Sequence, residues 1–197
     1  MKRRRKINRG AVLMLALAVL LIGSLTGLGI AHKAAKPILQ RELEAVMEAH
    51  TALLLLPEDY RNTEAAEVPE AVLAESAATA DEALRPYFAA TGKTYETTLR
   101  RLREQLQAQA DGSARRLFSL KRSLTSVDYS FEPGMVTVNF FYTDTVAYAD
   151  APAQTSRFDM LSGNATFRKE GGAWKLLYLS LSAPNGNGSF NIVQFMN

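Results

Sequence analysis

Two aspartates in neighbouring predicted strands have the residue type and spacing for acid–base chemistry. Asp144 is in phase with the apolar residues of one strand, and Asp159 is in phase with those of the next. A hairpin that is symmetric about its loop would place the two side chains opposite each other. Like charges directly opposite are unfavourable, and in a low-dielectric cavity one carboxyl keeps its proton. The alternative is that both carboxyls lie at exposed strand ends beside the loop "ADAPAQ".

Three aromatic residues are the candidates for contacting a ligand, namely Tyr142, Tyr148 and Trp174. Trp174 is the only tryptophan of the chain, and it follows a Glu-Gly-Gly turn in a strand near the C-terminus. A buried indole removes roughly 200 Å² of surface from water and favours packing against another aromatic ring. We therefore expect Trp174 to pack on Phe167 and to hold the final hairpin together, with ligand stacking as the alternative.

The histidine and arginine residues do not form recognisable sites with their sequence neighbours. His50 lies on the apolar face of a predicted helix, with no cysteine, second histidine or paired carboxylate nearby. We expect a packed, hydrogen-bonded imidazole there rather than a metal ligand or a general base. The basic pairs Arg115-Arg116 and Lys121-Arg122 flank "LFSL". We expect them to form a solvated sheet edge rather than a phosphate site.

Several residue types and motifs are absent from the sequence, and their absence excludes some classes of functional site. The chain contains no cysteine, which excludes a disulfide framework, a thiolate metal site and a cysteine nucleophile. No HExxH, GxSxG, GxGxxG or Walker pattern occurs. The sequence therefore predicts neither a metal nor a cofactor, and it favours a protein without catalytic activity.

The charges are distributed unevenly along the chain. Residues 1–10, "MKRRRKINRG", hold six of the 23 bases and no acid, and residues 11–31 hold no charge. The remaining residues carry 17 bases against 20 acids. Because this larger part is mildly acidic, the basic pI does not indicate nucleic-acid binding, and the basic cluster is typical of a targeting segment.

Residues 11–31 are expected to anchor the protein in a membrane. These 21 uncharged residues, as a helix rising about 1.5 Å each, would span roughly 31 Å, close to the ~30 Å hydrocarbon core. The positive-inside rule then places residues 1–10 in the cytoplasm and the rest of a single-pass bacterial membrane protein outside. The alternative is a signal peptide cleaved near Ala31, although the apolar stretch of a signal peptide is usually only about 7–15 residues.

Three helices are predicted before any strand. The first covers residues 37–56, with Pro37 at a favourable first helical position. The second, over residues 69–88, is rich in alanine. The third, over residues 94–109, places Tyr95, Leu99, Leu102 and Leu106 on one face.

The second half of the chain predicts a sheet. In "SVDYSFE" the residues Val127, Tyr129 and Phe131 share one face. Short hairpins follow one another, so neighbouring strands should be antiparallel. The predicted fold class is α+β: an N-terminal transmembrane helix, then about three helices packed on a curved antiparallel sheet of four or five strands.

Two stretches resemble the nuclear transport factor 2-like superfamily, the cone-shaped fold of ketosteroid isomerase, scytalone dehydratase and many secreted bacterial domains. "ADEALRPYFAATGKTYETTLRRL" is similar to that family's passage from its second to its third helix, and "ATFRKEGGAWKLLYLSLS" is similar to its final hairpin. The resemblance covers about residues 80–182. It implies a cone-like domain over residues 61–197, with residues 32–60 as a juxtamembrane helix or stalk.

The resemblance also suggests two functions. The resemblance to ketosteroid isomerase implies that one of the two aspartates is a general base, with Tyr142 or Tyr148 as hydrogen-bond donor. The family's acid–base motif does not match residue by residue, so no catalytic role is assigned to Asp144, Asp159 or Tyr142. An anchor followed by a cone also resembles membrane-anchored assembly proteins of type IV secretion and conjugation machines. We therefore expect an extracytoplasmic binding or assembly module with a protein partner or its own copies, the alternative being a small-molecule-binding or isomerase-like enzyme that uses the cone cavity.

Overall fold

A computed structural model describes residues 9–62, 67–90 and 94–181, and between Arg9 and Gly29 it describes the side chains of Met14 and Leu17 alone. Among the residues so described, no helix is both long and apolar enough to cross a membrane. Most of the predicted cytoplasmic tail, residues 1–10, and most side chains of the predicted anchor, residues 11–31, lie outside the described residues.

The first helix is longer than the sequence pattern predicts. Helix α1 runs from Arg9 to Leu53 and contains Pro37, so a start at Pro37 is wrong. The chain divides into two compact units, Met1–Ile38 and Leu39–Asn197. In the second unit, Leu39, Leu43 and Val46 of α1 are completely buried. Their spacing of four and three places them on one helix face, so this stretch contributes directly to the core of the second unit.

The remaining helices follow the predicted pattern. A short helix α2 covers Glu58–Arg61, α3 covers Glu70–Leu84 and the 3₁₀-helix η1 covers Arg85–Tyr87. Helix α4 covers Thr94–Ala110 and buries Leu99, Leu102 and Leu106. The predicted alanine-rich helix and the predicted third helix are thus confirmed.

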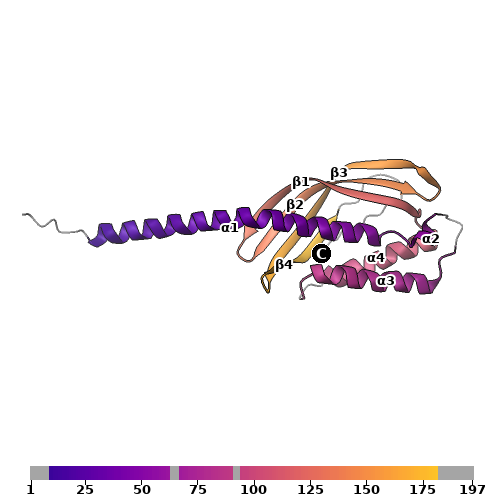
Figure 1. Ribbon diagram of the computed structural model, residues 1–197, viewed down its shortest axis with the longest axis horizontal. Coiled ribbons are helices and arrows are strands. Elements are labelled where there is room, and N and C mark those ends of the chain that lie inside the picture. Colours follow the sequence, from indigo (N-terminus) through magenta and orange to yellow (C-terminus); the bar gives the residue numbers. More distant parts are fainter. Residues whose placement is uncertain (1–8, 63–66, 91–93, 182–197) are drawn as a thin grey trace, which may run out of the picture. The chain divides into compact units, whose positions relative to one another are not determined.

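Four antiparallel strands form one sheet in the order β1-β2-β3-β4 (Figure 1). They are β1 (Leu117–Glu132), β2 (Met135–Tyr148), β3 (Ala151–Glu170) and β4 (Ala173–Leu181). The outer edge of β4 is partly covered, because the backbone N–H of Ala89 donates to the carbonyl of Leu176. Within the described ranges no strand pairs with the outer edge of β1. Among the described residues, the outer edge of β4 is thus partly covered and the outer edge of β1 has no paired strand.

The two faces of the sheet differ in chemistry. The inner face is defined by the buried alternate residues of β2 and the residues paired with them, among them Val138, Phe140 and Tyr142. The outer face carries polar residues, and Asn164 donates a hydrogen bond to Asn139 across it. A Cβ atom at Gly163 would overlap the Phe140 ring, so the inner face uses glycine where the aromatic ring lies against β3.

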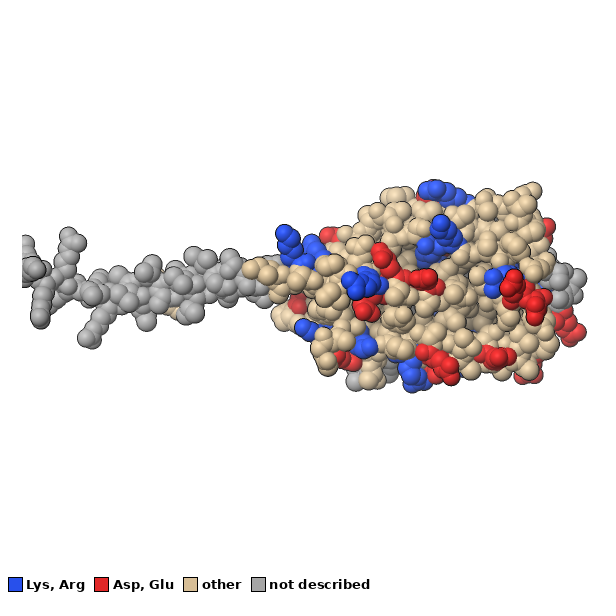
Figure 2. Space-filling view, in the orientation of Figure 1, with Lys and Arg blue, Asp and Glu red and all other residues tan. Residues whose placement is uncertain are grey.

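Buried polar groups join the helices to the start of the sheet. Gln109 at the end of α4 donates to the carbonyl of Leu54 and accepts from the backbone N–H of Leu117 at 2.9 Å. Arg116 is 3% exposed and donates to the carbonyl of Tyr60. These hydrogen bonds fix where β1 begins relative to the helices. Elsewhere on the surface, acidic and basic side chains are interspersed on the face shown in Figure 2.

The final hairpin corrects the prediction for Trp174. In the part of the β3–β4 register next to the turn, Phe167 pairs with Leu176 and Trp174 pairs with Lys169. Phe167 is 1% exposed, whereas Trp174 is only partly buried. The expected packing of Trp174 on Phe167 is therefore wrong, because the two-residue turn at Gly171-Gly172 sets a register that places Trp174 opposite Lys169.

Replacing these two aromatic residues should therefore have unequal effects. Phe167→Ala removes a fully buried ring and should lower the free energy of unfolding by about 3–5 kcal/mol. Trp174→Ala should lower it by roughly 1–2 kcal/mol, since part of the indole already contacts water. Thermal melting followed by circular dichroism compares the two variants. Equal losses would mean that the indole is as important to the core as the Phe167 ring.

Candidate functional site

A buried ion pair lies on the inner face of the sheet. Arg122 of β1 donates through Nε to Oδ1 of Asp144 and through Nη2 to Oδ2, and both distances are 2.8 Å. The two side chains are 2% and 0% exposed, respectively. The residues are direct partners in the β1–β2 register, so the sheet itself sets their distance. Two parallel charge-assisted bonds are the strong form of such a pair.

Two further side chains surround the same guanidinium. His50 of α1 is 5% exposed, and its Nδ1 lies 3.5 Å from Arg122 Nη1. The centre of the fully buried Tyr142 ring lies 4.9 Å from Arg122 Cζ, within the range of a cation–π interaction. We name Arg122, Asp144, His50 and Tyr142 the inner cluster. It joins α1 to β1 and β2.

The environment keeps His50 neutral. Burial, and to a smaller extent the positive charge of Arg122, lowers the pKa of His50 from 6.5 to about 3. The neutral ring has one nitrogen that accepts a hydrogen bond, and Nδ1 faces the Arg122 donor. An imidazole with so low a pKa is a weak base near neutral pH. The prediction of a packed, partnered histidine at this position is confirmed.

The two aspartates do not meet. The β2–β3 register pairs Asp144 with Phe158, because two residues of β3, Asp159 and Met160, lie opposite Thr143 alone. Met160 adopts the left-handed conformation, with a φ of 58°. Asp159 accepts from the Thr143 hydroxyl at 2.8 Å and from Arg157 at 2.9 Å. The expected facing pair is therefore wrong, since this bulge directs Asp159 to the partly solvated side of β3.

The electrostatics of Asp159 also differ from that expectation. The hydrogen bond from Arg157, and then that from Thr143, lowers the pKa of Asp159 below its usual value. A shared proton between the aspartates would require a carboxyl with a raised pKa. Asp159 thus acts as a partner of its own strand and of Thr143, not as an acid in a cavity.

The other predicted contact residues are dispersed. Tyr148 lies near the start of the sheet, where the Arg115 guanidinium sits 3.7 Å from its ring centre. Arg115 also forms an ion pair with Asp150 at 2.6 Å. Burial raises the pKa of Tyr148. Tyr142 and Asp144 belong to the inner cluster, whereas Tyr148 and Trp174 pair with residues at opposite ends of β3, Ala151 and Lys169.

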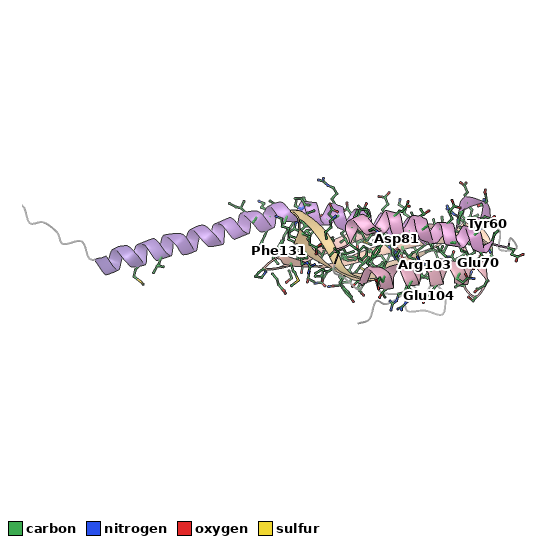
Figure 3. The ribbon with its side chains drawn as sticks, turned by 90° about the horizontal axis from the view of Figure 1, so that it is seen from below. Tyr60, Glu70, Asp81, Arg103, Glu104 and Phe131 are labelled. Atoms are coloured by element: carbon green, nitrogen blue, oxygen red, sulfur yellow. The ribbon has the colours of Figure 1, made fainter. Side chains whose placement is uncertain are left out.

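A second polar cluster connects α3, η1 and α4. Tyr95 donates to Asp81 at 2.5 Å, and Arg85 donates to both oxygens of the same carboxylate. Burial and the hydrogen bond to Asp81 raise the pKa of Tyr95 to about 12. The same hydrogen bond is the largest cause of the lowered pKa of Asp81, to which Arg103 also contributes. Figure 3 shows Asp81 on α3 and Arg103 on α4, the helices that this cluster joins.

A groove of about 590 Å³ lies between α1 and the outer edge of β1. Met47 and Thr51 line it from α1, Leu55 lines it just beyond the helix, and the consecutive residues Leu120–Leu124 line it from β1. Successive side chains of a strand point to opposite faces, so a groove lined by five consecutive residues runs along the strand edge. We name this feature the edge groove.

Arg122 is the site residue that the sequence analysis missed. The prediction of a solvated sheet edge is correct for Arg115 and Lys121, which are exposed, and wrong for Arg116 and Arg122. The available signal was the phase of Arg122, which alternates with Leu120 and Leu124. A base on the apolar side of a strand needs a buried acid, and Asp144 lies on the apolar side of the next strand.

The polar groups of the inner cluster are occupied by one another. Both Asp144 oxygens are occupied by Arg122, and in the described part of the chain every buried side-chain nitrogen and oxygen has a hydrogen-bond partner. The described side chains also contain no group of three or more His, Cys, Asp or Glu residues that could hold a metal ion. The arrangement suits a core-organising role better than proton transfer to a substrate.

The ion pair yields a prediction on stability. Asp144→Asn should lower the free energy of unfolding by about 3–5 kcal/mol, because the Arg122 charge is left buried and uncompensated. The double variant Arg122→Met/Asp144→Leu should recover most of this loss, since it removes both charges together. Thermal or chemical unfolding of the three proteins gives the comparison. A stable Asp144→Asn protein would show that water reaches the guanidinium.

His50 yields a prediction on pH. Between about pH 3 and 6.5 the unfolded chain binds a proton at His50 and the folded chain does not, so stability declines as the pH falls. From pH 7.5 to 5, His50 should account for a loss of about 2 kcal/mol. His50→Gln should remove that part of the loss, and His32→Gln serves as the control. Identical pH profiles for His50→Gln and wild type would contradict the buried neutral imidazole.

In comparisons with known proteins, the chain is similar to solved structures only. No family model matches the chain, and no match is found among curated proteins. The solved structures that it resembles include nuclear transport factor 2-like proteins and proteins with a cystatin-like fold. One is a protein from Novosphingobium aromaticivorans, at 13% identity and a TM-score of 0.43, with 84% of this chain and 97% of that chain covered.

Two further structures belong to the same group. A nuclear transport factor 2-like protein of unknown function from Pseudomonas putida has 10% identity and a TM-score of 0.43, again with 84% and 97% of the two chains covered. A nuclear transport factor 2-like superfamily protein from Salmonella enterica has 13% identity and a TM-score of 0.32, over 44% of this chain. The chain spans 62% of the length of that last relative.

Proposed function

We propose that this protein is a membrane-anchored, extracytoplasmic binding or assembly module without catalytic activity. The observation that carries the proposal is the bidentate bond between Arg122 and Asp144. This bond occupies both oxygens of Asp144, one of the two aspartates that the sequence analysis considers as a general base. The inner face thus supports a rigid core, and recognition falls to the outer surface and the edge groove.

The anchoring part of the proposal rests on the first 31 residues. Six bases precede 21 uncharged residues, which is the order of a single-pass anchor with its N-terminus in the cytoplasm. The remainder has mixed charge, as the face in Figure 2 illustrates. Mixed charge suits a protein partner or another copy of the same chain better than a polyanion.

A small-molecule-binding or isomerase-like enzyme is the second candidate. The observation in its favour is the edge groove, because its volume of about 590 Å³ falls within the usual range for small-molecule sites. Glu44 and Glu48 line it from α1, and Lys121 lines it from β1. These carboxylates would be the acid–base groups of such an enzyme, in place of Asp144 and Asp159.

The non-catalytic proposal predicts that the inner cluster is replaceable. The variant Arg122→Met/Asp144→Leu should fold and should still enter the same membrane complex, seen as an unchanged band on native gels of solubilised membranes. Wild-type protein that migrates only at its own mass would contradict an assembly role. Loss of the complex from a double variant that melts like wild type would mean that the inner cluster itself takes part in function.

The topology is tested separately. Impermeant protease added to intact protoplasts should digest the part of the chain beyond residue 31 and leave a small membrane-embedded fragment. This result follows if the bases remain inside and the domain lies outside. Full protection would contradict the orientation, and release of the domain into the medium would show cleavage near Ala31 instead.

A further inference from the structure

We propose that the edge groove and a second hollow beside it bind an extended segment of a partner protein in which basic residues alternate with apolar ones. The proposal rests on the proposed function and deepens it, because it names the chemistry of the partner that a binding or assembly module would take. The two hollows suit such a segment in their continuity, charge, floor and length.

The second hollow has a volume of about 510 Å³ and adjoins the edge groove. Its lining comes from the end of α1, from α2 and from one face of α3, where Val72, Glu75 and Thr79 lie at helical spacing. Ala52 and Leu55 line both hollows. The two therefore meet at the C-terminal end of α1, and we name the second one the α3 hollow.

The lining of the two hollows is richer in acids than in bases. One of the lining bases, Arg122, already has its charge compensated by Asp144. None of the lining acids takes part in an ion pair among the described residues. Each hollow therefore offers two carboxylates to a positively charged ligand. The charged lining residues are the acids Glu44, Glu48, Asp59 and Glu75 and the bases Arg61, Lys121 and Arg122.

The junction of the two hollows adds to this preference for a cation. Helix α1 ends at Leu53, and Ala52 and Leu53 both line the α3 hollow. The C-terminal end of a helix carries a partial negative charge, because its last carbonyl groups have no partner within the helix. A positive side chain is therefore favoured at the junction as well as next to the carboxylates.

Apolar side chains form the floor of both hollows. Met47 and Leu120 in the edge groove are 3% and 8% exposed, and Leu56 in the α3 hollow is completely buried. The lining acids, in contrast, are all exposed at the rim. Successive side chains of an extended segment point to opposite sides. Apolar residues of the segment would thus reach the floor, while the basic residues between them stay near the carboxylates.

The length of the two hollows corresponds to a short peptide. Glu44 and Ala52 are about 12 Å apart along α1, and Val72 and Thr79 are about 10 Å apart along α3. A segment that contacts both hollows therefore needs about seven extended residues, at about 3.3 Å each. Acids at both ends of this path favour a ligand with several separated positive charges over a compact one with a single charge.

Three labelled peptides of that length test the chemistry on the full chain in nanodiscs of phosphatidylcholine, whose headgroups carry no net charge. One peptide alternates lysine with leucine, one glutamate with leucine, and one lysine with serine. Fluorescence polarisation should show the lysine–leucine peptide binding at least tenfold more tightly than the other two. Equal binding of the lysine–serine peptide, tighter binding of the glutamate–leucine peptide, or no binding of any of the three overturns the proposal.

Charge reversal in the lining gives matched variants. Glu48→Lys/Glu75→Lys places one base in each hollow and should weaken the lysine–leucine peptide at least tenfold, because like charges then meet. Glu42→Lys/Glu82→Lys changes the net charge equally on the same two helices but outside both linings, and should leave the affinity within about twofold. Lys121→Glu should tighten binding at least twofold.

The variants are compared where their melting by circular dichroism matches wild type. All of the substituted lining residues are exposed, so their replacement should leave the fold intact. Equal weakening in the two double variants overturns the proposal, because the peptide would then respond to the net charge of the molecule and not to the hollows. Weaker binding to Lys121→Glu also overturns it.

The native gel of solubilised membranes separates this proposal from the proposed function. Glu48→Lys/Glu75→Lys should lose the complex that Arg122→Met/Asp144→Leu retains. A variant that loses the peptide but keeps the complex overturns the assignment of the partner to the hollows and leaves the assembly role intact. Wild-type protein that binds the lysine–leucine peptide but enters no complex supports the hollows as a binding site and contradicts the assembly role.

Discussion

The ion pair between Arg122 and Asp144 is the constraint on which the inner face depends. A guanidinium excluded from water is tolerable only if its hydrogen bonds are met within the protein. Asp144 accepts hydrogen bonds from Nε and Nη2 of Arg122, and the neutral ring of His50 lies next to Nη1. The Tyr142 ring lies near the guanidinium plane in a cation–π contact. The helix, the edge strand and the neighbouring strand must therefore keep fixed positions relative to one another. Removal of one partner from such a buried pair is strongly destabilising, and here side chains of three elements surround the pair.

The bulge at Met160 keeps a second carboxylate away from the Arg122–Asp144 ion pair. Without the extra residue, regular alternation would turn Asp159 toward Asp144, and two carboxylates would compete for one guanidinium. The bulge instead gives Asp159 to Thr143 and Arg157. A conformational cost at one backbone position, the positive φ of Met160, thus prevents a like-charge contact in the core.

Much of the fold follows from local sequence patterns, whereas most of the candidate site does not. The helices over residues 70–84 and 94–110, the turn at Gly134 and the shared face of Val127, Tyr129 and Phe131 all follow from periodicity and turn chemistry. Alternation cannot locate a bulge, because the inserted residue leaves no mark in composition. The pairing of Asp159 was therefore mispredicted. Charge alone also fails to separate Arg122 from Lys121, since only the phase of Arg122 with Leu120 and Leu124 places it inside.

Trp174, the only tryptophan of the chain, is half-buried, and this position determines which part of the protein its fluorescence reports on. Indole emission depends on the polarity next to the ring, and this ring is at the β3–β4 hairpin opposite Lys169 rather than in the core. The wavelength maximum of the native protein therefore describes the hairpin and is insensitive to the inner cluster. Circular dichroism averages over all helices and strands, so the two signals sample different parts of the molecule. Loosening of the hairpin would appear in the fluorescence while the helices remain intact, and the chain carries that local optical probe without any label.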